Sequence, residues 1–195
     1  LTFEAGSQIT EIAANAFNNC RNLQTVVLPE GIVTIADAAF YQNQQLNSIV
    51  LPSTLKTIGM SAFHESIRLT SISLPHGLET IKGMAFYSSA LTGNVEIPAS
   101  VTSIGARAFD NMSRLKTVTI LGDSTNLVIA DNAFMGGEPN VYNGITDIYI
   151  EGRNEGTVGG SQAWGAQYAV VHWKDGDYGP EVIIVKDENN NPMWH

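Results

Sequence analysis

The chain repeats one arrangement of apolar and polar positions along most of its length. In a representative copy, Ile72 and Leu74 alternate with serines, which predicts a short strand with one buried face. A proline follows and should end that strand, because proline has no N–H for the ladder. Leu78 and Ile81 then direct a second apolar pair inward. An Ala-Phe pair ending at Phe86 predicts one helical turn, with the ring filling the space between coils.

The spacing of this pattern is regular. The phenylalanines of the Ala-Phe pairs lie 23 residues apart until the last interval, which is 25: Phe17, Phe40, Phe63, Phe86, Phe109 and Phe134. The prolines of the Leu/Ile-Pro pairs follow the same period, at Pro29, Pro52, Pro75 and Pro98. A period of this length is typical of leucine-rich repeats, in which each coil contributes one strand. The sequence therefore predicts a repeat solenoid of about six coils, with short parallel strands and short helical turns.

The repeat also carries a family resemblance. At Ile49–Phe63 it reads Ile-x-Leu-Pro-x-x-Leu-x-x-Ile-Gly-x-x-Ala-Phe. This motif, repeated over roughly residues 7 to 151, resembles the BspA-like leucine-rich repeats of bacterial and some protozoan surface proteins. The resemblance implies a curved, right-handed solenoid that is displayed at a cell surface or secreted. It also implies a role in adhesion or host-protein binding.

Two regions are expected from the pattern. Residues 1–150 should form the solenoid, in which residues 1–3 begin the sheet as a strand. Residues 151–195 should form a β-rich C-terminal cap with a strand at 169–173 and a β-hairpin, or the start of a further module. Because the chain does not begin with Met, we expect that a signal peptide has been removed.

Outward strand positions are the first candidate binding residues. Stacking in register aligns them in two ladders, one of Thr25, Ser48, Ser71, Asn94, Thr117 and Asp147, and one of Val27, Val50, Ser73, Glu96, Thr119 and Tyr149. Small and β-branched side chains suit neighbouring parallel strands, so one interpretation is a solvated sheet face. The other interpretation is a binding surface, which solenoids often form on their sheet.

The positions that follow the phenylalanines are the second candidate. They include Tyr41, His64 and Tyr87, whose rings either anchor a partner or pack over the coil edge. Residues 121–144 depart from the repeat in two turn-rich loops, and loops often carry specificity.

Composition narrows the function classes. The 195 residues carry a net charge of -9, which argues against nucleic acid and against anionic lipid as partners. No run of apolar residues is long enough to span a bilayer, so we expect no membrane insertion. The single cysteine, Cys20, excludes an internal disulfide and is expected to be a small buried residue.

Catalytic chemistry has no positive signal. No two of the four histidines have a metal-ligand spacing, and no nucleophile or phosphate-binding motif occurs. Asp175, Asp177 and Glu181 resemble a calcium loop but lack its order of ligands, which favours an acidic turn. We therefore expect no enzyme activity, no metal and no cofactor.

Two functions remain. The first is a monomeric interaction module that binds an extracellular or host protein, or a glycan. The second is a structural spacer that displays another module. The spacer is supported by ladders of Ser, Thr and Val, because binding hot spots are usually Trp, Tyr or Arg.

Overall fold

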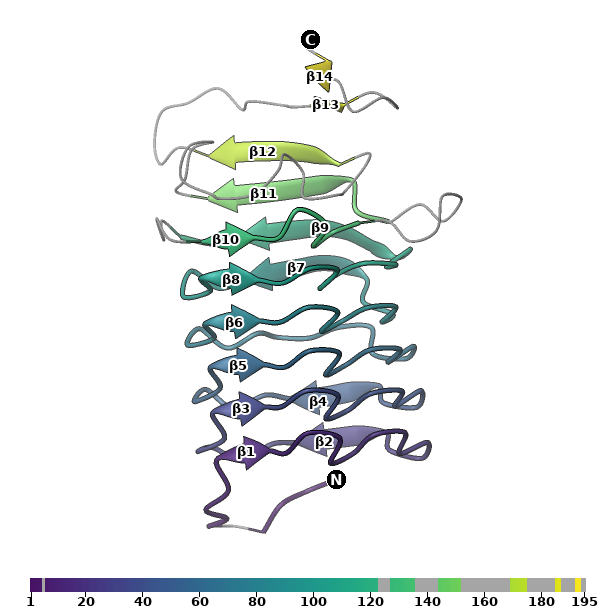
Figure 1. Ribbon diagram of the computed structural model, residues 1–195, viewed down its shortest axis with the longest axis vertical. Coiled ribbons are helices and arrows are strands. Elements are labelled where there is room, and N and C mark those ends of the chain that lie inside the picture. The colour runs from purple at the N-terminus through teal and green to yellow at the C-terminus, as the bar shows by residue number, and fades with distance from the viewer. Residues whose placement is uncertain are drawn as a thin grey trace.

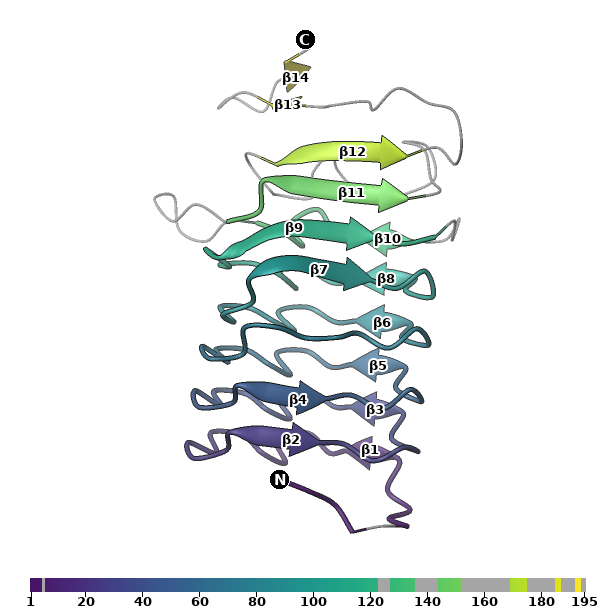
Figure 2. The same cartoon turned by 180° about the vertical axis from the view of Figure 1, so that it is seen from behind.

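The computed structural model describes residues 1–4, 6–122, 127–135, 144–151, 169–174, 185–186 and 192–193. Coils stack along one axis, and their strands line two sides of the stack (Figures 1 and 2). All strand pairs within the stack are parallel. The predicted solenoid with short parallel strands is confirmed.

The first side carries the strands that the sequence predicts. They are β2 (Thr25–Val27), β4 (Ser48–Val50), β7 (Gly93–Ile97), β9 (Leu115–Ile120), β11 (Asp147–Glu151) and β12 (Val170–Lys174). These strands form two separate sheets, β2-β4 and β7-β9-β11-β12 (Figure 2). We call the solvent side of these two sheets the outward face.

The second side carries a sheet that was not predicted from the sequence. Its strands have two residues each: β1 (Glu11–Ile12), β3 (Thr34–Ile35), β5 (Thr57–Ile58), β6 (Thr80–Ile81), β8 (Ser103–Ile104) and β10 (Val128–Ile129). They form one continuous six-stranded sheet (Figure 1). In each strand the isoleucine is buried, whereas its neighbour is half-buried or exposed. The second apolar pair of each repeat therefore points inward as predicted, but its isoleucine belongs to a strand.

The phenylalanines form a continuous stack through the core. Consecutive rings from Phe17 to Phe134 lie 5.2 to 5.7 Å apart between centroids. All of them are fully buried except Phe17, which is half-buried in the first coil. Neighbouring coils thus share one aromatic column, which no single coil could bury alone.

The predicted helical turns are wrong, because the described residues contain no helix. Around Phe40, successive backbone N–H groups donate to different coils. Ala39 N–H donates to the Ala36 carbonyl of its own coil, whereas Phe40 N–H donates to the Ala62 carbonyl of the next coil. Two residues of the segment, Ala38 and Gln42, have φ near +55°. A left-handed residue breaks the i→i−4 hydrogen-bond pattern that a helix needs. The Ala-Phe pair therefore lies in two consecutive turns, which we call the double turn.

The outward face is interrupted in the third full repeat. The segment Ser71–Leu74 has the alternation of a strand, but it pairs with neither β4 nor β7. Its backbone makes no hydrogen bond with any described residue. In the next coil, Leu91 lies one residue earlier than its counterparts, and β7 starts with a register shift at Gly93 and Asn94. We call this break in the outward face the seam.

The two ends of the stack bear differently on the predictions. The strand predicted at residues 1–3 is wrong: Leu1 exchanges two hydrogen bonds with β2, from Val27 N–H to its carbonyl at 3.1 Å and from its amino group to the Thr25 carbonyl at 2.6 Å, but the first strand of the chain is β1. Strand β12 confirms the strand predicted at 169–173 and pairs along its whole length with β11. The short strands β13 (Val185–Lys186) and β14 (Pro192–Met193) pair antiparallel, as a hairpin would. The boundary between 150 and 151 stays a prediction.

Candidate interaction surface

The two predicted ladders exist on the outward face, but the seam interrupts them. Thr25 lies opposite Ser48, and Val27 lies opposite Val50. Beyond the seam, one ladder runs Asn94, Thr117, Asp147 and the other runs Glu96, Thr119, Tyr149. Ser71 and Ser73 are exposed at the seam and lie in no strand. The structure thus brings the predicted residues onto one face, and their role in binding stays a prediction.

The chemistry of this face changes along the stack. Val27 and Val50 are 48% and 53% exposed and lie opposite each other, so they form a small apolar patch. Beyond the seam the side chains are polar and contact one another. The Thr119 hydroxyl donates to Asn94 Oδ1 at 3.1 Å, which orients the Asn94 amide. A partner would therefore meet an apolar end and a polar end.

At the C-terminal end of this face, His172 joins the ladders. Its Nε2 lies 2.9 Å from Asp147 Oδ1, and its ring stacks on Tyr149 at 4.2 Å. Burial favours the protonated carboxyl of Asp147, but hydrogen bonds from Thr146 and His172 outweigh it and hold the pKa of Asp147 below its ordinary value. This pair was not predicted from the sequence, although His172 occupies the next position of the Tyr149 ladder.

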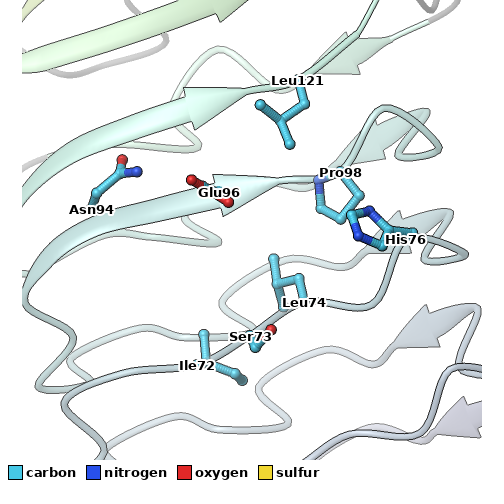
Figure 3. Close-up of a pocket in the computed structure, with 8 residues that line it drawn as sticks. All are labelled: Ile72, Ser73, Leu74, His76, Asn94, Glu96, Pro98 and Leu121. Atoms are coloured by element: carbon cyan, nitrogen blue, oxygen red, sulfur yellow. The ribbon is translucent and has the colours of Figure 1, made fainter.

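A pocket of about 260 Å³ opens at the seam. It is lined by Ile72, Ser73, Leu74, His76, Asn94, Glu96, Pro98 and Leu121 (Figure 3). We call it the seam pocket. Its walls come from the Ser71–Leu74 segment on one side and β7 on the other. Ile72 is only half-buried, whereas its counterparts Val95 and Val118 are almost fully covered. The missing strand pairing thus exposes part of the core.

The edge aromatics form a second column rather than separate anchors. The His64 ring lies between Tyr41, at 4.8 Å, and Tyr87, at 4.7 Å. The Arg107 guanidinium lies over the Tyr87 ring, 4.9 Å from its centroid, and pairs with Asp110 at 2.7 Å. All three rings are half-buried, because each packs against its neighbours along the coil edge. Packing over the edge is therefore their main contact, and a binding role for them stays a prediction.

Burial shifts the pKa values of two side chains in this column. Burial lowers the pKa of His64, although Glu65 lies 3.5 Å from its Nε2 and opposes that effect. Burial also raises the pKa of the fully buried Asp110, despite its ion pair with Arg107. Both pKa shifts follow from burial in the column of side chains along the coil edge, which we call the edge column.

Other candidates from the sequence fall in different places. Cys20 is half-buried rather than buried. Much of the two loops within 121–144 lies outside the described residues, as do Asp175, Asp177 and Glu181. In the described part, no group of three or more His, Cys, Asp or Glu side chains could hold a metal ion. That part also has no helix long and apolar enough to cross a membrane.

Comparison with known proteins places the repeat in a family. Residues 7–139 match the BspA type leucine-rich repeat region in 6 copies. No curated protein sequence matches the chain significantly.

Three solved structures of bacterial proteins are similar in fold. A leucine-rich cell surface protein from Faecalibacterium prausnitzii is 24% identical over 98% of this chain and 52% of its own, with a TM-score of 0.72. The pneumococcal vaccine antigen PcpA is 26% identical over 76% of this chain and 35% of its own, with a TM-score of 0.63. The T. pallidum leucine-rich repeat protein is 25% identical over 88% of this chain and 65% of its own, with a TM-score of 0.60.

This chain therefore spans between about a third and two thirds of each of these structures. The likeness extends along the stacked coils, and the family match covers more than half of the residues. The chain belongs to the BspA-type leucine-rich repeat family.

Proposed function

We propose that this chain is a non-enzymatic protein-interaction module of a bacterial surface or secreted protein, and that it binds through the outward face. The observation that carries the proposal is the exposure of Val27 and Val50 side by side in β2 and β4. Aligned apolar side chains on a sheet face cost solubility, and on soluble proteins such patches commonly mark interaction sites.

Two of the similar proteins support a location at the cell surface. One of the similar structures is described as a cell surface protein, and another as a pneumococcal vaccine antigen. A module of this kind would act outside the cell, as a monomer, on an extracellular or host protein in adhesion. A glycan is the alternative ligand.

The test is a binding screen against extracellular-matrix proteins, plasma proteins and a glycan array at near-physiological salt. Val27→Thr with Val50→Thr removes the apolar pair and keeps β-branched side chains in both strands. The matched control changes Val33→Thr with Val128→Thr, two exposed valines on the side of the six-stranded sheet. A saturable partner that is lost with the first pair and kept with the second supports the proposal.

A second candidate function is a structural spacer. It is favoured by the continuous stack of coils and by ladders composed mostly of Ser, Thr and Val. If no protein or glycan binds the chain saturably, the spacer is the better account. A partner that is lost only with the Val33 and Val128 changes would move the binding face to the other side of the stack.

A further inference from the structure

The seam pocket has the size and lining of a site for one side chain. Its volume of about 260 Å³ falls below the range of most small-molecule sites, which begins near 300 Å³. Leu74, Pro98 and Leu121 lie together at one end of it, while Asn94 and Glu96 lie along β7 (Figure 3). A ligand must therefore have an apolar part and a polar part only a few atoms apart.

Glu96 determines the sign of the polar part. It is the one carboxylate in the pocket lining, and the lining includes no lysine or arginine; the imidazole of His76 lies at the other end, beside Pro98 (Figure 3). No described residue forms an ion pair with it. The net charge of the chain, -9, adds a negative potential over the whole surface. Both the local and the global charge favour a cationic group.

The backbone beside the pocket favours a guanidinium group over an ammonium group. Carbonyl groups of the Ser71–Leu74 segment accept no hydrogen bond from any described residue. A guanidinium group has five N–H donors in a planar fork and can bond a carboxylate and neighbouring carbonyls together, whereas an ammonium group is a compact point charge. The aliphatic stem of arginine also packs well on leucine and proline side chains.

We propose that the seam pocket takes an arginine side chain of a partner protein, with the guanidinium at Glu96 and the stem over Leu74, Pro98 and Leu121. This inference rests on the proposed function and names the chemistry of the partner. Arginine is among the residues that most often anchor protein interfaces.

The direct test is a titration followed by methyl NMR, with N-acetyl-arginine amide as the probe and its citrulline analogue as the uncharged isostere. We expect saturable shifts of the Ile72, Leu74 and Leu121 methyl groups, with an affinity in roughly the millimolar range because Glu96 is exposed. The citrulline compound should bind about threefold more weakly or worse. Equal shifts with both probes, or no saturation, would overturn the inference.

Two pairs of variants separate the pocket from general effects. Glu96→Gln should remove the preference for arginine over citrulline, and Glu11→Gln, an exposed glutamate of β1, should keep it. Ser73→Leu should fill the pocket and abolish the shifts. Ser71→Leu adds the same side chain to the same segment outside the pocket lining and should leave them. Circular dichroism of each variant reports whether the fold is retained.

A random peptide library separates this inference from the proposed function. Selection on the wild-type chain should enrich peptides with an arginine, and binding should fall when that arginine becomes citrulline. Peptides that bind the outward face without this dependence would overturn the arginine pocket and leave the interaction module standing. Binding of glycans alone at the seam would also overturn it.

Discussion

The rings of Phe63 and Phe86 stack nearly parallel, 8° apart in plane and 5.3 Å apart between centroids. Each is fully buried, and each belongs to a different coil. One aromatic contact therefore connects two copies of the repeat, and the same contact recurs along the stack.

Truncating a central ring of this column should be costly. We expect Phe63→Ala to lower the free energy of unfolding by about 3–5 kcal/mol, because it leaves a cavity between two stacked neighbours. Urea unfolding measures the change. Phe17→Ala is the matched control and should cost less, because Phe17 is half-buried and stacks on one side only. A loss below about 1 kcal/mol at Phe63 would contradict the core assignment.

The double turn predicts stability changes of opposite sign when either of two adjacent alanines is replaced by glycine. Ala38 has φ +55°, a left-handed conformation that is strained for any residue with a Cβ. Ala38→Gly should stabilise the chain by about 0.5–1 kcal/mol, because relief of that strain exceeds the entropy that glycine adds to the unfolded state. Ala39 is fully buried outside the left-handed region, and Ala39→Gly should destabilise by about 1–2 kcal/mol. Chemical denaturation of both variants reports the signs, and equal signs would contradict the strain argument.

The close approach of neighbouring coils predicts the effect of a single methyl group. A Cβ on Gly59 would lie 2.5 Å from the Ala36 backbone carbon, which cannot move like a flexible side chain. Gly59→Ala should therefore destabilise by about 1–3 kcal/mol in thermal or urea unfolding. In the control, Gly77→Ala, the nearest backbone atom is 3.3 Å away, so its effect should be smaller. The reverse order would show that the coils can separate locally.

The edge column predicts a pH dependence of stability. The pKa of His64 is lowered from 6.5 by burial between Tyr41 and Tyr87, with Glu65 opposing and Arg107 reinforcing the shift. The unfolded chain then binds the proton more tightly than the folded chain. This contribution to stability is therefore present above the unfolded pKa, near 6.5, and is lost as the pH falls through the lower folded value.

The measurement is the melting temperature of the wild type and of His64→Phe between pH 7.5 and 5.5. Phenylalanine keeps a ring in the column and cannot take up the proton, so the variant should lose less stability on acidification. His76→Gln, at an exposed histidine, should behave as the wild type. Parallel pH profiles for all three proteins would exclude His64 as the titrating group.

Hydrogen exchange tests the seam. The amides of Ser71, Ile72 and Ser73 have no hydrogen-bonded partner in the described structure, whereas those of β9 lie between two strands. We expect the seam amides to exchange faster than the amides of Val118 and Ile120. Equal protection in both segments would show that the outward face is continuous in solution.

The core was predictable from the sequence because it repeats. Phe40 and Phe63 recur with a constant period, and only inward positions need to keep an apolar side chain in every coil. The ladder from Asn94 to Asp147 followed from the same register. Stacking thus converts sequence spacing directly into spatial contact.

The exceptions depend on backbone geometry that the pattern does not encode. Nothing in an alanine such as Ala38 signals a left-handed residue, so the turn was interpreted as helical. The Ser71–Leu74 segment alternates as a good strand does, but it is unpaired beside a coil in which Leu91 comes one residue early and β7 shifts register against β9 at Gly93. That one-residue shift was visible in the sequence, and its effect on pairing, and hence the seam pocket, was not.

The seam also has a mechanical meaning. Between β4 and β7 the outward side has no interstrand hydrogen bonds, whereas the six-stranded sheet runs past this point through β5, β6 and β8 without a break. At this level the coils are held together by that sheet and by the double turns, where Phe63 N–H donates to the Ala85 carbonyl at 2.7 Å and Glu65 N–H to the Tyr87 carbonyl at 2.9 Å. Tension along the axis would be borne unequally there, and bending should concentrate at this level, where the outward side can open while the six-stranded sheet and the double turns hold.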